Sequence, residues 1–280
     1  MVSWPGGAKV AVLVTVAYEL WSQGRWPVYS PMVTSWPISP EVSDEHSISW
    51  SQYGTRAGVW RLLDVLAEHD VPATFVTSAL AVEQFPDSVL AIRRAGHEVA
   101  GHSMSQDVLM PYLDRDAERA NLLRCHDAFA QLTGVRPVGW CSPRATATAD
   151  TAVLLAEDGC IWSGDHNDAD LPYVIDTPAG PIVAIMHSDF TDVRGAAAGP
   201  RSFRDVHCDT LDYLLTTPGP EILNITIHAH VGGRPQLATM FSQILAHVRA
   251  AGPSVWVATH QQAAAWILEQ DRTSRPSSAD

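Results

Sequence analysis

The feature that most constrains the fold is an alternation of short apolar runs and amphipathic segments along almost the whole chain. Val10 to Val16 is a continuous β-branched and apolar run, which is typical of a strand buried on both faces. Further strands are predicted at 72–76, 97–100, 138–140, 161–163, 182–186, 222–227 and 255–258. Helices are predicted between them at 55–69, 86–95, 114–132, 148–157, 204–215, 236–250 and 261–269. Repeated β-then-α units without a linker predict one parallel, barrel-like domain.

A long segment at 18–53 separates the first strand from the first predicted helix. It is rich in Pro, Ser and Trp and has no clear helical period. A loop of this length inside a compact domain is usually functional, and we expect it near the active site. Its tryptophans either form an aromatic wall over a pocket or pack on one another at the surface, and they are Trp21, Trp26, Trp36 and Trp50. We predict a barrel domain over 1–270 and a disordered tail over 271–280, which is polar and Pro/Ser-rich.

The amino-acid composition limits the classes of molecule that this protein can bind. The 280 residues carry a formal net charge of −13, which argues against nucleic acid, and no stretch approaches the roughly 18 apolar residues of a membrane span. The 4 cysteines are scattered without a CxxC pair, which favours a reduced, cytoplasmic protein. No GxGxxG or Walker motif follows the first strand, which disfavours a nucleotide fold. We therefore expect a small-molecule substrate and no nucleic-acid or membrane partner, and we leave a homo-oligomer open.

Reactive side chains follow the predicted strands, where the chemistry of a parallel barrel is found. Glu19 lies just past the first strand, His102 follows the third, and His228 ends the strand at 222–227. We predict these three as catalytic residues. Substrate contacts are predicted in the same loops and beside them, at Trp21, Arg56, Asp107, Ser142, Arg144, Asp165, Asp168, His230 and Arg234.

Each of these assignments has a structural alternative. His102 could be a satisfied histidine of the barrel interior, and the aspartates at 165–170 could form a solvated turn, because Asp and Asn favour turns. His228 and His230 are two residues apart, so on a regular strand they share a face, whereas in a solvated loop they would not line a pocket. The predicted arginines could equally form structural ion pairs.

Several stretches together resemble a known family. They are WPGGAKVAVLVTVAYE (from Trp4), QYGTRAGVWRLLDVL, PATFV, AGHEVAGHS, TGVRPVGWCSPR, DADLPY, IHAHVGGRP and VWVATH. In this order they resemble the polysaccharide deacetylase superfamily, and within it the branch of allantoinase-like cyclic amide hydrolases. The resemblance covers most of the chain from Trp4 to Trp266. It implies an α/β fold, a deformed (β/α)7 barrel, and a hydrolase that acts on C–N bonds.

The resemblance also bears on a metal. Metal-dependent members use an aspartate base, an aspartate ligand and two histidines four residues apart. The aspartates fall at Thr15 and Ala17, the first histidine matches His102, and the second falls at Gln106. Because a zinc site needs three or four protein ligands, we predict no tightly bound catalytic metal and no other cofactor. Nearby carboxylates stay open as ligands for a divalent metal such as zinc.

The leading functional hypothesis is hydrolysis of a small amide, cyclic amide or imide. Glu19 would be the general base, with a pKa raised by burial among the tryptophans, and His102 or His228 would donate to the oxyanion or to the leaving nitrogen. The alternatives are a non-hydrolytic enzyme (proton transfer, cyclisation or lyase), a ligand-binding pseudoenzyme and, least favoured, a metal-dependent polysaccharide deacetylase. Allantoinase-like members share the glutamate and both histidines but carry asparagine near Ala17, which weighs against allantoin itself as the substrate.

Overall fold

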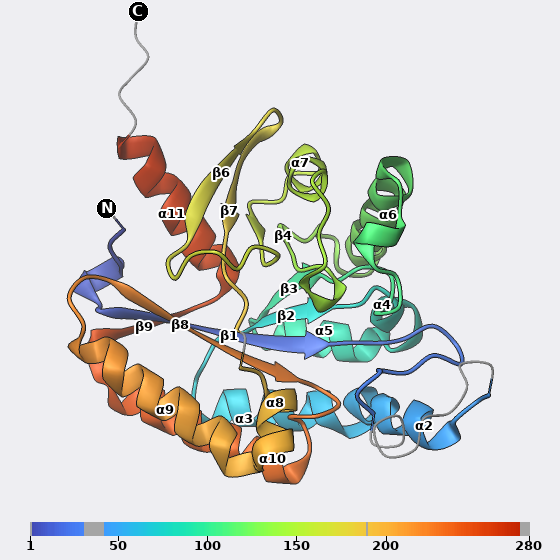
Figure 1. Ribbon diagram of the computed structural model, residues 1–280, viewed down its shortest axis with the longest axis horizontal. Coiled ribbons are helices and arrows are strands. Elements are labelled where there is room, and N and C mark those ends of the chain that lie inside the picture. Colours follow the sequence, from blue (N-terminus) through green and yellow to red (C-terminus); the bar gives the residue numbers. More distant parts are fainter. Residues whose placement is uncertain (1, 31–41, 189, 275–280) are drawn as a thin grey trace, which may run out of the picture.

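One curled, mostly parallel sheet organises the protein (Figure 1). The computed structural model describes residues 2–30, 42–188 and 190–274. The strands of this part of the chain are β1 (Val10–Tyr18), β2 (Thr74–Thr77), β3 (Glu98–Gly101), β4 (Gly139–Trp140), β5 (Trp162–Ser163), β6 (Tyr173–Thr177), β7 (Gly180–Ala184), β8 (Glu221–His228) and β9 (Val255–Ala258). Their order is β6-β7-β5-β4-β3-β2-β1-β8, and β9 pairs with β1.

Strand β1 is the centre of the sheet. All nine of its residues are buried, as the apolar run from Val10 predicts for a strand covered on both faces. It pairs in parallel with β8 along most of its length, with β9 over Val10–Leu13 and with β2 over Thr15–Tyr18. The carboxyl ends of β1, β2, β3 and β8 therefore meet at one end of the barrel, and the loops that follow them build the site.

Helices cover the outside of the sheet, with α3, α9 and α10 beside β1 and β8 in Figure 1. The helices of the described chain are α2 (Glu45–Tyr53), α3 (Val59–Glu68), α4 (Leu80–Gln84), α5 (Pro86–Arg94), α6 (Arg115–Thr133), α7 (Thr151–Glu157), α8 (Asp192–Ala198), α9 (Pro200–Thr216), α10 (Pro235–Ala250) and α11 (His260–Ser274). Shorter turns are η1 (Pro5–Gly7), η2 (Gly54–Gly58), η3 (Met110–Tyr112), η4 (Pro143–Ala145) and η5 (Gly252–Ser254). Asp114 caps α6, and its Oδ1 accepts from the amide of Ala117 at 2.8 Å.

The prediction of a deformed β/α barrel is confirmed. The barrel does not close through strand pairing, since the strand order ends at β6 on one side and at β8 on the other. The Asn224 side chain of β8 reaches across and donates to the carbonyl oxygen of Met186 at 2.7 Å. Strand β6, which was not predicted, pairs antiparallel with β7 and forms a hairpin that extends the sheet.

Three predicted boundaries were wrong. The segment at 18–53 is not all loop, because β1 runs to Tyr18 and α2 begins at Glu45, while 31–41, with Trp36, lies outside the described residues. The helix predicted from Thr55 begins as the π-helix η2. At η2 the backbone lies very close to the loop that follows β8. A Cβ on Gly58 would lie 1.8 Å from the carbonyl oxygen of Ala229 in that loop. Helix α11 continues to Ser274, so the tail predicted at 271–280 begins as helix, and 275–280 lies outside the described residues.

No helix of the described residues is both long enough and apolar enough to cross a membrane.

Candidate active site

The centre of the candidate site is the Glu19 carboxylate, which is held just beyond the end of β1. Its side chain is only 8% exposed and faces three histidines. Oε1 lies 3.5 Å from Nε2 of His102 and 3.8 Å from Nε2 of His228, and Oε2 lies 3.9 Å from Nδ1 of His230. The structure thus brings all three predicted catalytic residues together, with His230 beside them.

His228 is oriented from behind by Asp192, the first residue of α8. Nδ1 of His228 donates to Oδ1 of Asp192 at 2.6 Å, and the backbone amide of His228 donates to Oδ2 at 2.8 Å. This fixes the proton on Nδ1 and turns Nε2 toward Glu19. Burial lowers the pKa of His228, but the charges of Asp192 and Glu19 outweigh burial and raise this pKa to about 9. At neutral pH His228 is therefore an imidazolium.

Glu19 is ionised because the positive charge of His228 lies beside it. Burial raises the pKa of Glu19, but the charge of His228 and the hydrogen bond from His102 outweigh burial and lower it to about 2. The expectation that burial among tryptophans would raise this pKa toward neutrality was wrong. Burial alone would raise the pKa of Glu19, but the positive charge that another strand end brings next to the carboxylate lowers it.

His102 is held by the strand next but one to β1. Its Nδ1 donates to the carbonyl oxygen of Cys141 at 2.5 Å, because a carbonyl can only accept. The Nε2 atom is left facing Glu19. The following residue, Ser103, has a φ of +62°, and its backbone carbonyl accepts from the amide of Ala79 at 2.9 Å. This turn at the end of β3 points the imidazole into the barrel mouth.

Tyr29 and His230 support the other oxygen of Glu19. The hydroxyl of Tyr29 donates to Oε2 at 3.2 Å and lies 3.0 Å from Nε2 of His230. Since the hydroxyl proton goes to Glu19, the oxygen accepts from Nε2–H of His230, which leaves Nδ1 without a proton. Nδ1 has no hydrogen-bond partner within the described ranges. Burial lowers the pKa of His230 to about 3, so this ring is neutral.

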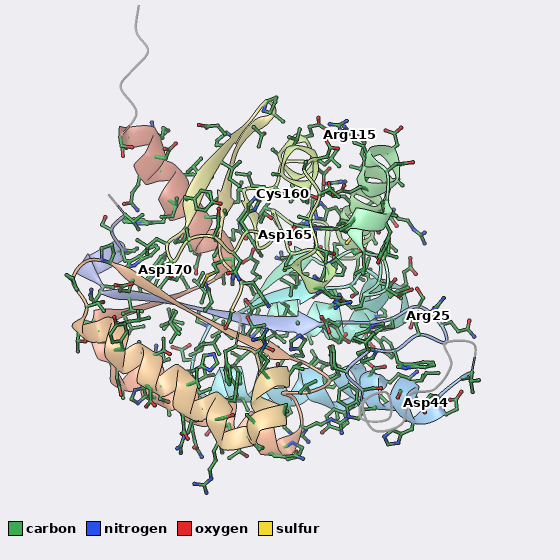
Figure 2. The ribbon with its side chains drawn as sticks, in the orientation of Figure 1. Arg25, Asp44, Arg115, Cys160, Asp165 and Asp170 are labelled. Carbon is green, nitrogen blue, oxygen red and sulfur yellow. The ribbon has the colours of Figure 1, made fainter. Side chains whose placement is uncertain are left out.

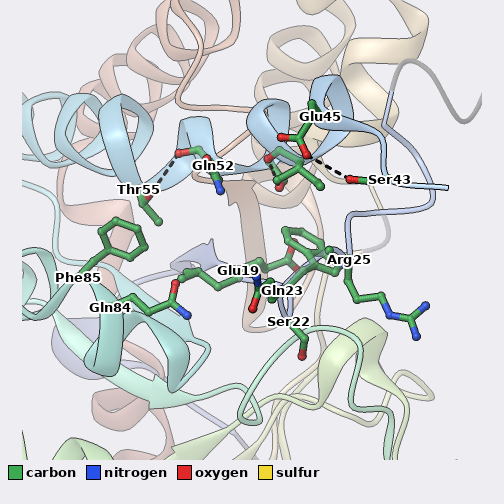
Figure 3. Close-up of a pocket in the computed structure, with 15 residues that line it drawn as sticks. Glu19, Ser22, Gln23, Arg25, Ser43, Glu45, Gln52, Thr55, Gln84 and Phe85 are labelled. Atoms are coloured by element: carbon green, nitrogen blue, oxygen red, sulfur yellow. Dashed lines mark hydrogen bonds between the residues drawn. The ribbon is translucent and has the colours of Figure 1, made fainter. Parts of the chain in front are cut away.

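Two cavities meet at Glu19. One, of about 410 Å³, is lined by the carboxylate, by His102 and His228, and by Tyr29, Ser142, Arg144, Asn167, His187 and Arg194. The other, of about 500 Å³, lies on the side of α2, and Figure 3 shows Gln52 and Gln84 on opposite sides of it with Glu19 between them. We take the first as the candidate active site, because both histidines that face Oε1 line it.

The loop after β4 forms one wall of this cavity. The amide and hydroxyl of Ser142 donate to the two carboxylate oxygens of Asp165 at 2.6 and 2.7 Å. Asp165, labelled in Figure 2, thus supports the loop from the side of β5. Arg144 and Ala145 follow with φ of +58° and +53°. Non-glycine residues in this region cost of order 1–3 kcal/mol each and cluster at functional sites.

Three other predicted substrate contacts bond to neighbouring residues of the protein and do not line this cavity. Asp107 is exposed and accepts from the amide of Ser22 at 2.9 Å, and Asp168 accepts from the hydroxyl of Tyr173 at 2.8 Å. Arg56 is exposed on η2, and its guanidinium lies 3.5 Å from the amide oxygen of Gln52. None of these three side chains is among those that line the cavity with His102 and His228.

The remaining two predicted contacts brace His230. The guanidinium of Arg234 donates to the carbonyl oxygens of His230 at 3.0 Å and of Trp50 at 3.1 Å, and it lies 4.3 Å from the ring centre of Tyr53. Trp21 packs edge-on against His230 at 5.2 Å and lines the cavity on the side of α2. Trp21 and Trp50 therefore pack edge-on around a site residue, and Trp21 also lines a cavity, as the aromatic-wall interpretation expects.

Asp192, Tyr29 and Arg194 are among the site residues that were not predicted from the sequence. Asp192 follows β7 in HSDFTDVR, and this strand end could have been searched like the others. Tyr29 lies in the long segment, where no periodicity places a side chain. Arg194 lies two residues after Asp192 on α8 and lines the cavity.

Comparisons with known proteins agree with this geometry. The sequence model of the family described as "Polysaccharide deacetylase" matches residues 50–160. A Schizosaccharomyces pombe protein that is named as a polysaccharide deacetylase is 26% identical to this chain over the aligned residues. The match covers 94% of this chain and 92% of the Schizosaccharomyces pombe protein. The crystal structure of a probable polysaccharide deacetylase of Pseudomonas aeruginosa superposes with a TM-score of 0.85, at 28% identity over 95% of this chain and 93% of that one.

A second solved structure, of an allantoinase, has a TM-score of 0.84 at 27% identity over 94% of this chain and 91% of that one. These comparisons support the polysaccharide deacetylase superfamily. Its members are hydrolases of amide C–N bonds, and the prediction that this chain is such an enzyme is confirmed at this level.

The residues present do not fit the metal that metal-dependent polysaccharide deacetylases use. Ala17 lies on the cavity wall with a methyl group, at the position where the resemblance implies an aspartate ligand. Gln106 is buried, and its amide nitrogen donates to the hydroxyl of Ser78 at 3.3 Å. Within 2–30, 42–188 and 190–274, no three His, Cys, Asp or Glu side chains form a group that could hold a metal ion. We therefore derive no step through a metal.

Proposed function

We propose that this protein hydrolyses a C–N bond of a small amide, cyclic amide or imide without the superfamily's metal, at the Glu19–His228 pair. The observation that carries the proposal is the arrangement of opposite charges 3.8 Å apart, with Asp192 behind the imidazole. A carboxylate and an imidazolium that lie next to each other in the lining of one cavity supply both functions of amide hydrolysis, a base for water and a donor for the oxyanion.

Each residue has a definite role in this proposal. The substrate carbonyl oxygen binds against Nε2–H of His228, which stabilises the oxyanion as it develops. Glu19 takes a proton from the attacking water, and the tetrahedral intermediate collapses as a proton passes to the leaving nitrogen. Tyr29 and His102 hold the carboxylate between them in the direction of the cavity.

A carboxylate with a pKa of about 2 is a weak base in the free enzyme. The charge of His228 is the largest influence that lowers this pKa. When the developing oxyanion neutralises the imidazolium or takes its proton, this influence disappears and Glu19 becomes more basic. The basicity of Glu19 therefore increases as the tetrahedral intermediate forms.

The size of the cavity favours a small substrate. About 410 Å³ lies within the roughly 300–1,000 Å³ of sites for small molecules. The similarity to an allantoinase supports the cyclic amide class, whereas the deacetylase names of other relatives point to acetylated sugars. Both classes react by the same attack of water on an amide carbonyl.

The test is a hydrolysis screen with matched variants. Hydantoins, cyclic imides, small linear amides and N-acetylglucosamine oligomers are incubated in ¹⁸O-labelled water with the wild type and with Glu19→Gln. We expect ring opening of a cyclic amide or imide, one ¹⁸O in the new carboxylate, and a loss of at least about 10²-fold in the variant. Turnover of acetylated sugars alone would contradict the substrate class. Conversion without ¹⁸O incorporation would contradict hydrolysis.

A further inference from the structure

Two arginines line the candidate active site without partners of their own. Arg144, after β4, and Arg194, on α8, are exposed and border the cavity that contains His228. Throughout the described ranges of the chain, neither guanidinium has a hydrogen bond or an ion pair. Arg234, by contrast, donates hydrogen bonds to two backbone carbonyls.

The charged side chains that line this cavity are mostly positive, whereas the whole chain is negative. The net charge of the protein is −13, yet Glu19 is the one carboxylate among the described residues that line the cavity. Arg144, Arg194 and the His228 imidazolium contribute three positive charges to the lining, and the carboxylates of Asp192 and Asp165 lie behind it, hydrogen-bonded to His228 and to Ser142. A cleft lined by one sign of charge raises the local concentration of ligands of the other sign.

The backbone holds Arg144 in this position. Two successive residues in the left-handed region, Arg144 and Ala145, follow Pro143, and the amide of Ala145 donates to the carbonyl oxygen of Ser142 at 2.8 Å. The double hydrogen bond from Ser142 to Asp165 fixes the start of this turn. Burial raises the pKa of Tyr29, and the charge of Arg144 opposes this rise, which places Arg144 within electrostatic reach of the hydroxyl that contacts Glu19.

We propose that the substrate carries a carboxylate beside its scissile amide or imide, and that Arg144 and Arg194 bind this carboxylate at the mouth of the cavity. The inference rests on the proposed function and names the charge of its substrate. Guanidinium groups pair with carboxylates through two parallel hydrogen bonds, which fixes orientation as well as affinity. The two arginines would thereby position the carbonyl against the Glu19–His228 pair.

The test uses two probes with the same ring. Hydantoin-5-acetate carries a carboxylate, and hydantoin-5-acetamide replaces it with a neutral amide. We expect the wild type to favour the carboxylate in kcat/KM by about tenfold or more, and we expect Arg144→Gln and Arg194→Gln each to lose most of this preference, measured as the ratio of kcat/KM for the two probes. Arg124→Gln, an exposed arginine of α6, removes the same charge elsewhere and should leave the preference intact.

Binding separates this inference from the proposed function. If neither ring is opened, the hydrolysis of hydantoins fails, and titration calorimetry with both probes still measures the preference. Tighter binding of hydantoin-5-acetate by the wild type, abolished in Arg144→Gln and Arg194→Gln, would sustain the inference. The absence of any preference for the carboxylate, whether both probes bind equally or neither binds, would overturn it.

Discussion

Nδ1 of His228 lies 2.6 Å from Oδ1 of Asp192, so that the other nitrogen of the ring points at Glu19, 3.8 Å away. The three residues come from β8, from the start of α8 and from the end of β1, and they meet because parallel strands end on the same side of the barrel. The pairing places two carboxylates around one imidazole. It makes His228 a cation at the pH at which most enzymes work.

Asp192→Asn tests whether Asp192 keeps His228 charged. The amide preserves the shape but removes the charge that raises the pKa of His228 to about 9. Activity that needs the imidazolium is lost as the pH rises through this pKa, so we expect the alkaline limb of kcat/KM to move to lower pH. At pH 8 the loss should be about 10-fold to 100-fold. The pH profile measures it, and Asp209→Asn, exposed on α9, is the control. An unmoved alkaline limb would remove His228 as the cation.

The same pair predicts a dependence of stability on pH. The pKa of Glu19 falls from 4.5 to about 2 on folding, so its contribution is present above pH 4.5 and is lost as the pH falls toward 2. The pKa of His228 rises from 6.5 to about 9, so its contribution is present below pH 6.5 and is lost as the pH rises toward 9. Both contributions are complete between pH 4.5 and 6.5.

Urea unfolding of Glu19→Gln across this range measures the effect. Breaking a buried pair by removal of one partner costs about 3 kcal/mol, and we expect the deficit to be largest near pH 5.5 and to shrink toward pH 9. Glu68→Gln, exposed on α3, should unfold like the wild type at every pH. A deficit that stays constant from pH 5 to 9 would show that charge pairing is not its cause.

Tyr29→Phe removes the hydroxyl that joins Glu19 to His230. Without the donor at 3.2 Å, the carboxylate loses a support on Oε2, and His230 loses the acceptor at 3.0 Å. We expect kcat to fall by about 3-fold to 10-fold with KM nearly unchanged, since a hydrogen bond to a charged group contributes roughly 1.5–3 kcal/mol and part is recovered by water. Steady-state kinetics beside Tyr213→Phe, whose side chain is 66% exposed, measures this change. An altered KM with unaltered kcat would assign Tyr29 to substrate binding.

Ser142→Ala tests the support of the loop that carries Arg144. The substitution removes the hydroxyl that donates to Asp165 at 2.7 Å and accepts from the indole of Trp140 at 2.9 Å. Burial already raises the pKa of Asp165, so the loss of a donor leaves a poorly solvated carboxylate. We expect a loss of about 1–3 kcal/mol in the free energy of unfolding. Urea denaturation beside Ser49→Ala, exposed on α2, provides the comparison, and equal stability of the two variants would contradict the role assigned to this hydrogen bond.

The strands and the three predicted catalytic residues could be found from the sequence for a simple physical reason. The apolar run from Val10 has to be buried on both faces, and residues just after parallel strands have to converge, so Glu19, His102 and His228 meet. Their charge states could not be derived this way. The pKa of Glu19 depends on cations that lie at the ends of other strands, and burial alone predicts the opposite direction.

Residues outside the regular pattern were harder to place. Tyr29 lies in a segment without periodicity, so nothing in the sequence indicates that it touches Glu19. Asp192 follows a strand end, the kind of position that pointed to the other site residues, but it was not predicted from the sequence. A lack of pattern also made Asp107 and Asp168 look like pocket residues, although each satisfies a donor of its own neighbourhood. The π-helix at Gly54–Gly58 follows from a tertiary contact with Ala229, which a local pattern cannot reveal.

The central claim is that the Glu19–His228 pair, without a metal, performs the hydrolysis. The most direct measurement is turnover of the substrate found in the screen by protein that has been treated with a chelator and dialysed, with its metal content determined on the same sample. The account predicts less than about 0.1 metal ion per chain, unchanged kcat/KM after chelation, and no gain on adding zinc, while Glu19→Gln stays inactive in every sample. Loss of turnover on chelation, restored by one equivalent of zinc, would contradict it.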